Sequence, residues 1–165
     1  MKTNRGKTFE KNVKDALIKA GYYTLRLQDS MGGFAGVNNP CDFIAFKTPQ
    51  FWMFECKAIR GGTLNFKAHI RPNQEEGMYN AFMSHNDIYA GFLVWFMDYD
   101  IIKFYPIHEL KKAKEKNIKS FTYLDTYGYI VSAQKLRVNL IPDFGTGIFE
   151  HRAADLYKFI KEEEK

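Results

Sequence analysis

The chain has 165 residues, a net charge of +5 and a sequence pI of about 9.1, with 45% apolar and 26% charged residues. This composition is ordinary for a folded globular protein and excludes a chain that is disordered throughout. No apolar run reaches the roughly 20 residues of a membrane helix, and no signal-peptide stretch follows Met1.

We therefore expect one cytoplasmic domain spanning residues 1–165. The two cysteines, Cys41 and Cys56, lack zinc-type spacing and fit a reducing compartment. Basic side chains concentrate in the first part, where residues 1–71 hold 12 Lys and Arg against 5 Asp and Glu. A basic half of this kind indicates either a polyanionic partner or a solvated basic face, and charge alone does not separate the two.

The first element predicted is a helix from Thr8 to Ala20, capped by Thr8 and ended by Gly21. Residues 22–27 are typical of a strand, and residues 28–40, rich in glycine and asparagine, of a loop. The helix prediction rests on an apolar stripe at helical spacing, formed by Phe9, Val13, Ala16, Leu17 and Ala20.

Two short apolar runs, residues 42–46 and 51–57, predict a buried central hairpin. A basic loop should follow over residues 58–71. The next helix is predicted from Asn73 to Ser84, because Asn73 and Glu76 have the spacing of a capping box.

The remaining elements are two strands, 89–97 and 101–105, and a short polar helix over 108–116. Residues 137–141 favour a further strand, and 149–161 favour a final helix. Helices and strands in this order predict an α/β fold, a mixed central sheet flanked by helices.

The predicted hairpin brings two acidic residues together. If its loop holds two or four residues, and four is the length we favour, then residue 42 pairs with residue 55. The β-carbons of Asp42 and Glu55 would then lie about 4.5–5.5 Å apart. A three-residue loop would instead place the two carboxylates on opposite faces. Lys57 projects from the same face as Glu55, because it lies two residues further along the strand.

Two buried carboxylates this close favour a cation between them. Oxygen ligands beside an ammonium group suit Mg²⁺, with Mn²⁺ as a substitute, and the backbone carbonyl of Cys56 could add a third ligand. Such a site would activate a phosphodiester and an attacking water. The alternative is structural: Asp42 and Lys57 as ordinary strand ends, with Glu55 paired only to Lys57 or Arg26.

The spacing of Asp42, Glu55 and Lys57 resembles the PD-(D/E)xK nuclease motif. The start Asn4-Arg5-Gly6-Lys7-Thr8-Phe9-Glu10 resembles that of RecU-type Holliday junction resolvases. So do Phe51 to Lys57, the following Thr63-Leu64-Asn65-Phe66, and Gln74-Glu75-Glu76-Gly77-Met78. The loop 28–40 stands where that family has a longer stalk, and Cys41 separates Pro40 from Asp42. A compact member from a bacteriophage or prophage would fit.

The resemblance implies a restriction-endonuclease-like (PD-(D/E)xK) fold with Asp42 and Glu55 as metal ligands and Lys57 as the catalytic lysine. It further implies that Gln74 and Glu10 support catalysis, and that the protein is a homodimer in a bacterial cell or phage-infected host. The DNA contacts it suggests, together with those predicted from the basic loop, are Arg5, Lys7, Arg60, Lys67 and Arg71.

Three functions remain open at this point. The first is a metal-dependent resolvase that cuts four-way junctions. The second is an endonuclease of the same fold acting on flaps, nicked DNA or duplex DNA. The third is a catalytically inactive DNA-binding module, against which the complete set of two acids and a lysine argues.

Overall fold

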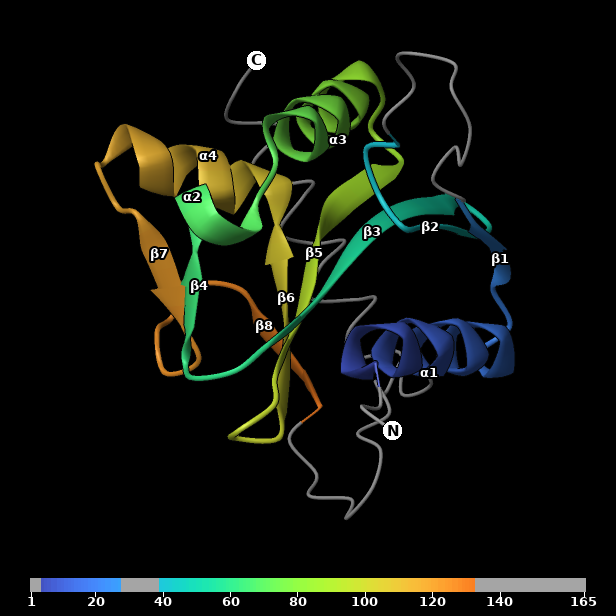
Figure 1. Cartoon of the computed structure of the whole chain (residues 1–165). Helices are drawn as coiled ribbons and strands as arrows, with labels where there is room; N and C mark the ends of the chain where they lie inside the picture. Colours follow the sequence, from blue (N-terminus) through green and yellow to red (C-terminus); the bar gives the residue numbers. More distant parts are fainter. Residues whose placement is uncertain (1–3, 28–38, 133–165) are drawn as a thin grey trace, which may run out of the picture.

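The computed structural model describes residues 4–27 and 39–132, and its centre is a six-stranded sheet in the order β1-β2-β3-β5-β6-β8 (Figure 1). Strands β3 and β5 are parallel and the other neighbours antiparallel, so the predicted mixed sheet is confirmed. A second sheet pairs β4 with β7. The elements are α1 (Arg5–Lys19), β1 (Tyr23–Arg26), β2 (Phe43–Lys47), β3 (Gln50–Ile59), β4 (Thr63–Asn65), α2 (Phe66–His69), α3 (Pro72–Ser84), β5 (Ile88–Phe96), β6 (Ile101–Pro106), α4 (Ile107–Glu115), β7 (Ser120–Thr122) and β8 (Tyr129–Ser132).

Helices cover both faces of the large sheet, which confirms the predicted α/β class with a mixed central sheet flanked by helices. Helix α1 packs on β3 and β1 on one side, where the ring of Phe9 lies 5.6 Å from that of Trp95. Helices α3 and α4 contact each other and β5 on the other side (Figure 1). The described elements share one apolar core, and a single domain over residues 1–165 stays a prediction.

Helix α1 begins earlier than its apolar stripe indicated. The predicted face is correct, since Phe9, Val13, Ala16 and Leu17 are all buried. The predicted cap is wrong, because Asn4 Oδ1 accepts the Lys7 N–H at 3.3 Å and caps the helix in place of Thr8. A short side chain one turn upstream satisfies these first amide groups.

The hairpin β2–β3 has the predicted register, with Phe46 opposite Phe51 and Ile44 opposite Met53. The favoured four-residue loop is wrong, because Lys47 pairs with Gln50 and only Thr48 and Pro49 form the turn. Loops of two and four residues keep the same faces together, so the juxtaposition of residues 42 and 55 does not depend on this difference.

The predicted basic loop over residues 58–71 is also wrong in part. Strand β3 continues to Ile59, which pairs with Phe96 of β5, and β4 and α2 follow. Leu64 and Phe66 are buried, and the Phe66 ring lies 4.7 Å from that of Phe121 on the neighbouring strand β7. Burial against a distant segment, and not local pattern, orders this part of the chain.

Helix α3 starts at Pro72, where the fixed φ of proline suits a first helical position. Gln74 Oε1 accepts the Arg71 N–H at 3.2 Å, so the predicted capping box of Asn73 and Glu76 is wrong. Strands β5 and β6 and helix α4 lie within a residue of their predicted bounds. The predicted strand 137–141, the predicted helix 149–161 and most of the predicted loop 28–40 lie outside the described residues.

Gly91, in the middle of β5, has no room for a side chain. An added β-carbon would overlap the carbonyl oxygen of Tyr105 and lie 2.7 Å from Phe104 Cζ. We expect Gly91→Ala to lower the free energy of unfolding by about 2–3 kcal/mol, measured by urea denaturation. Gly6→Ala is the control, because its nearest neighbour would be Asn4 Oδ1 at 3.5 Å, and its stability should hold or rise. Equal stabilities of the two variants would contradict the close packing of β5 on β6.

Candidate active site

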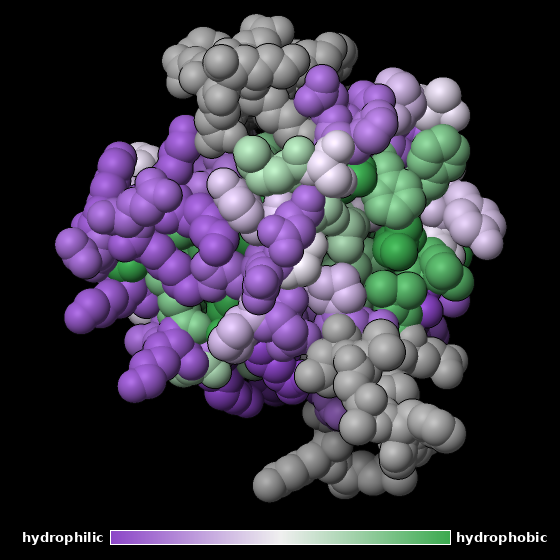
Figure 2. Space-filling view, turned by 90° about the horizontal axis from the view of Figure 1, so that it is seen from above, coloured by the Kyte–Doolittle hydropathy of each residue, from purple (hydrophilic) through white to green (hydrophobic). Residues whose placement is uncertain are grey.

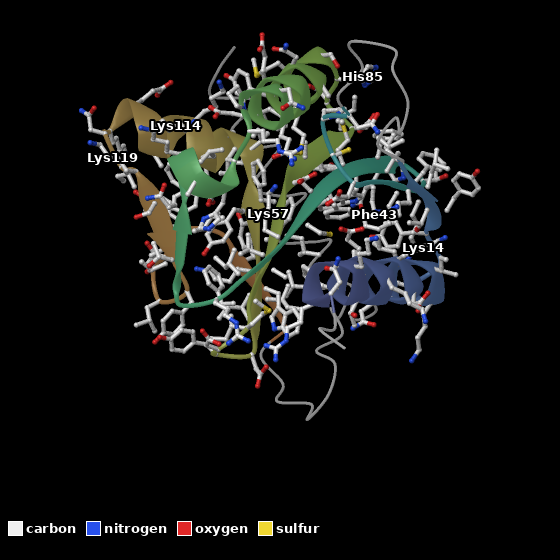
Figure 3. All side chains as sticks on the ribbon, viewed as in Figure 1. Lys14, Phe43, Lys57, His85, Lys114 and Lys119 are labelled. Atoms are coloured by element: carbon white, nitrogen blue, oxygen red, sulfur yellow. The ribbon has the colours of Figure 1, made fainter. Side chains whose placement is uncertain are left out.

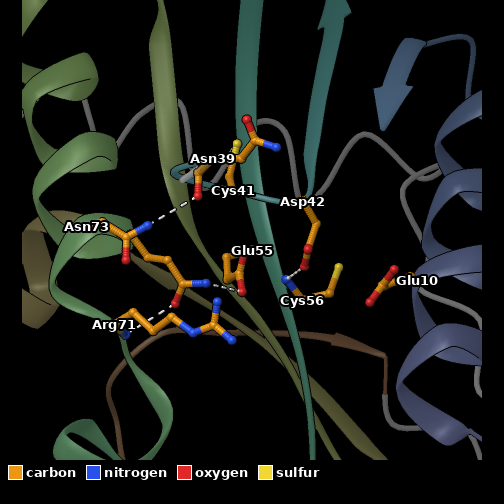
Figure 4. A pocket seen from close by; sticks show the side chains of 9 residues that line it. Glu10, Asn39, Cys41, Asp42, Glu55, Cys56, Arg71 and Asn73 are labelled. Atoms are coloured by element: carbon orange, nitrogen blue, oxygen red, sulfur yellow. Dashed lines mark hydrogen bonds between the residues drawn. The ribbon is translucent and has the colours of Figure 1, made fainter. Parts of the chain in front are cut away.

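A polar pocket of about 200 Å³ opens between α1, the β2–β3 pair and the start of α3 (Figure 4). It contains most of the predicted catalytic side chains in one place. Its lining residues are Glu10, Asn39, Cys41, Asp42, Glu55, Cys56, Arg71, Asn73 and Gln74.

Asp42 stands just before β2 and is held by the strand beside it. Its N–H donates to the Phe54 carbonyl at 3.0 Å, and its carboxylate Oδ2 accepts the Cys56 N–H at 2.8 Å. The β2–β3 register continued by one pair sets Asp42 opposite Glu55. The backbone thus fixes this carboxylate at the pocket, as the hairpin argument predicted.

Glu55 is only 5% exposed and lies at the centre of a hydrogen-bonded group. Its Oε1 accepts from Lys57 Nζ at 2.7 Å and from Gln74 Nε2 at 2.6 Å. Lys57 Nζ also donates to Gln74 Oε1 at 3.2 Å. Of the two pairings considered for Glu55, the one with Lys57 is present, and Gln74 joins it from α3.

The two carboxyl groups hold their protons more tightly than usual. Burial, and then repulsion from Glu55, raises the pKa of Asp42 to about 7. Burial also raises the pKa of Glu55, and the neighbouring Lys57 and Gln74 partly oppose this rise. A site that disfavours two negative charges gains most from a bound cation.

The residues present fit a magnesium ion. No hydrogen bond between described residues uses Asp42 Oδ1 or Glu55 Oε2, so one oxygen of each carboxylate is available. Within residues 4–27 and 39–132, no three His, Cys, Asp or Glu side chains gather as a metal cluster. Mg²⁺ does not need such a cluster, because it usually takes one or two carboxylates and fills its shell with waters and substrate phosphates.

Glu10 reaches the pocket from α1, on the side of β3 away from Arg71 (Figure 4). Its Oε2 accepts from Arg26 Nη2 at 2.6 Å, so Arg26 pairs with Glu10 and not with Glu55. This ion pair offsets the charge of Glu10 beside the carboxylates of Asp42 and Glu55. A catalytic role for Glu10 stays a prediction.

The predicted DNA contacts do not form one cluster. Arg71 alone lines the active-site pocket. Arg60 lies at the end of β3, 3.5 Å from Asp98, and Lys67 lines a different pocket beside α2. Arg5 and Lys7 are exposed in the first turn of α1.

Sequence reasoning did not identify Asn39 and Asn73 as pocket residues. Asn73 Nδ2 donates to the Asn39 carbonyl at 3.4 Å, across the mouth of the pocket. The sequence signal that could have identified Asn73 as a pocket residue is its position directly before Gln74, in the first turn of α3. Nothing in the local pattern around Asn39 indicates the contact.

The family model described as archaeal Holliday junction resolvase (Hjc) matches residues 1–123. A solved structure of Archaeoglobus fulgidus Hjc, described as a Holliday junction resolvase from an archaeal hyperthermophile, is 20% identical. The match covers 64% of this chain and 75% of the Hjc chain, with a TM-score of 0.44. No curated protein matches. No helix among the described residues is long and apolar enough to span a membrane.

Proposed function

The chain belongs to the archaeal Holliday junction resolvase family, whose model covers residues 1–123 of 165, and on this premise we propose that Asp42, Glu55 and Lys57 form its hydrolytic site. Membership of the family makes the protein a nuclease that acts on branched DNA. The observation that supports these three residues is a pocket lined by the half-buried Asp42 and the buried Glu55, while Lys57, which does not itself line the pocket, lies 2.7 Å from the Glu55 carboxylate.

Asp42 and Glu55 would hold a divalent metal, which we propose is Mg²⁺, with Mn²⁺ as a substitute. When bound, the metal supplies Lewis-acid activation of the scissile phosphate and of the attacking water. The Cys56 carbonyl is a further proposed ligand. Resolvases of this nuclease class are generally dependent on divalent metals, in agreement with the available carboxylate oxygens.

Lys57 and Gln74 complete the site from the protein side. Glu55 and Gln74 hold the Lys57 ammonium group, which can stabilise negative charge that develops on the phosphate. Gln74 orients Glu55 through its amide, and Arg71 at the pocket wall can bind a neighbouring phosphate. Glu10 would tune the electrostatics of Asp42 while its own charge is matched by Arg26.

We also propose that two copies act together as a homodimer. Tyr23, Leu25 and Phe46 are exposed on one face of β1 and β2, where Tyr23 lies opposite Phe46. Apolar side chains gather on that side of the molecule in Figure 2. A second copy would cover such a surface, and light scattering of the purified protein should give twice the chain mass of 19.3 kDa.

The family that matches is the archaeal type, which supports a Holliday junction resolvase of the PD-(D/E)xK type and not a RecU-type resolvase specifically. The phage or prophage source and the cytoplasmic location stay predictions. Preference for the four-way junction over flaps, nicked DNA or duplex is tested directly by cleavage.

The decisive experiment compares a four-way junction, a flap and a linear duplex of matched sequence in Mg²⁺. We expect rapid cleavage of the junction alone, with paired symmetric nicks at the branch. Equal rates on all three substrates would contradict the junction preference and leave a general nuclease. A failure to cut any substrate, with no metal bound, would favour the inactive binding module.

The raised pKa of Asp42 predicts how metal and pH act on stability. Folded Asp42 binds its proton more tightly than the unfolded residue does, so stability of the metal-free protein falls as pH rises from about 4 to about 7. We expect a loss of about 2 kcal/mol over this range, or about 5 °C in Tm, recovered by Mg²⁺ at pH 8 but not at pH 5. Differential scanning calorimetry measures both effects. Asp42→Asn should reduce the pH dependence to the part that comes from Glu55, whose pKa is also raised, and an unchanged profile in that variant would assign the effect to another group.

A further inference from the structure

A second and larger pocket, of about 640 Å³, lies between α2, the start of α3 and the turn after α4. A short length of chain, Ile70 to Glu75, separates it from the active site. Arg71 and Gln74 line the active-site pocket, whereas Ile70, Pro72 and Glu75 line the second one. Whatever occupies the second pocket therefore lies directly behind the wall of the first.

The second pocket is strongly basic. Lys67, Lys114 and Lys119 line it against one acidic residue, Glu75. Lys114 and Lys111 already neutralise Glu75 through ion pairs, the latter at 3.2 Å. Lys114 and Lys119 lie near each other at one end of α4 (Figure 3), and hydrophilic side chains gather on that side in Figure 2. This charge favours an anion.

The inner wall of the pocket is apolar. Phe66 and Ile70 are 4% and 7% exposed, and Ile118 packs against the same core. A phosphate alone would leave this apolar wall in contact with water. Paired bases are stacked inside a duplex and cannot enter the pocket. An unpaired nucleotide matches both parts, since it has an apolar base and charged phosphates on either side.

We propose that this pocket binds an unpaired nucleotide of a branched DNA strand, with the base against Phe66, Ile70 and Ile118 and the flanking phosphates on Lys67, Lys114 and Lys119. The proposal rests on the proposed function, because the active site must bring the DNA to this face. A helix is about 10 Å across, and one strand of DNA rises about 3.4 Å per nucleotide. The bound nucleotide would then lie about three positions from the scissile phosphate.

Three DNAs test the proposal by fluorescence anisotropy in EDTA: a paired duplex, the same duplex with one bulged nucleotide, and the bulge with an abasic residue. We expect the bulged duplex to bind about tenfold more tightly than the paired one, and the abasic bulge to lose most of that gain. Lys67→Gln with Lys119→Gln should abolish the preference and lower the salt slope of binding by about 2. The control is Lys112→Gln with Lys116→Gln, two exposed lysines of the same region that do not line the pocket.

A bulge preference that survives in the Lys67 and Lys119 variant, or is lost equally in the control, would overturn the proposal. Equal affinity of the wild-type protein for the paired and the bulged duplex would overturn the proposal as well. A free mononucleotide that displaces the bulged DNA at low concentration would overturn the choice of a DNA strand as the ligand. With Mg²⁺ and saturating junction, the control with Lys112→Gln and Lys116→Gln should keep the wild-type kcat. A cleavage defect confined to Asp42 or Glu55 variants thus tests the proposed function separately.

Discussion

Asp42→Asn and Glu55→Gln should each lower Mg²⁺-dependent cleavage of a four-way junction by about 10³-fold or more. Each substitution removes one of the two negative charges that would hold the metal, and Lewis-acid activation by a metal contributes several kcal/mol to such reactions. Binding of the junction should remain or tighten slightly, because a negative charge that repels phosphate is lost. Single-turnover cleavage and anisotropy binding of the same variants measure the two quantities.

These two variants preserve the local hydrogen bonds, which makes the result interpretable. In Asp42→Asn the new amide oxygen could still accept the Cys56 N–H, and in Glu55→Gln the new amide oxygen could still accept from Gln74 Nε2. Glu76→Gln is the matched control, since it removes an equal charge from an exposed position on α3. Cleavage by Asp42→Asn at the wild-type rate would place the metal site elsewhere. Loss of cleavage by Glu76→Gln would point to general damage.

Lys57→Met should lower kcat by about 10²-fold and change KM little. Methionine keeps the apolar stem of the side chain but removes the ammonium group that Glu55 and Gln74 position at 2.7 and 3.2 Å. That group would act mainly on charge that develops in the transition state, so its loss falls on kcat. Removing the cation also raises the pKa of Glu55 further, so the pH–rate profile should move to higher pH.

Lys57→Arg and Gln74→Met separate a chemical role for Lys57 from a structural one. Arginine restores the charge with a different shape, so it should recover only part of the rate. Gln74→Met removes the hydrogen bonds from Gln74 to Glu55 and Lys57, so the cleavage rate should fall by about 10- to 100-fold. If Lys57→Met kept the wild-type maximal kcat and only moved the pH–rate profile to higher pH, Lys57 would act by neutralising Glu55 and not on the transition state.

The core of the site was predictable because it depends on two adjacent strands. Side chains alternate along a strand, so Glu55 and Lys57 share a face whatever surrounds them. An even turn then places Asp42 opposite Glu55, and the observed two-residue turn has the same parity as the predicted four. Local patterns also predicted α1, α4 and the strands β5 and β6, whereas α3 is present although the capping box from which it was predicted is wrong.

Contacts between distant segments could not be obtained in this way. Strand β4 and helix α2 are too short to show a period, and they are ordered by burial of Leu64 and Phe66 against Phe121. The resemblance suggested Gln74, but only the packing of α3 on β5 shows that its amide bonds Glu55 and Lys57.

The placement of Asp42, Glu55 and Lys57 on one face of the hairpin was thus determined by the sequence alone. Strand alternation and hairpin register were sufficient for it. Tertiary structure decided the rest: Gln74 and Arg71 at one wall, Glu10 tied to Arg26 at the other, and a basic pocket behind Ile70 to Glu75. The physical reason is the range of the interactions. Backbone geometry sets the direction of neighbouring side chains, whereas burial and charge depend on which remote surfaces meet.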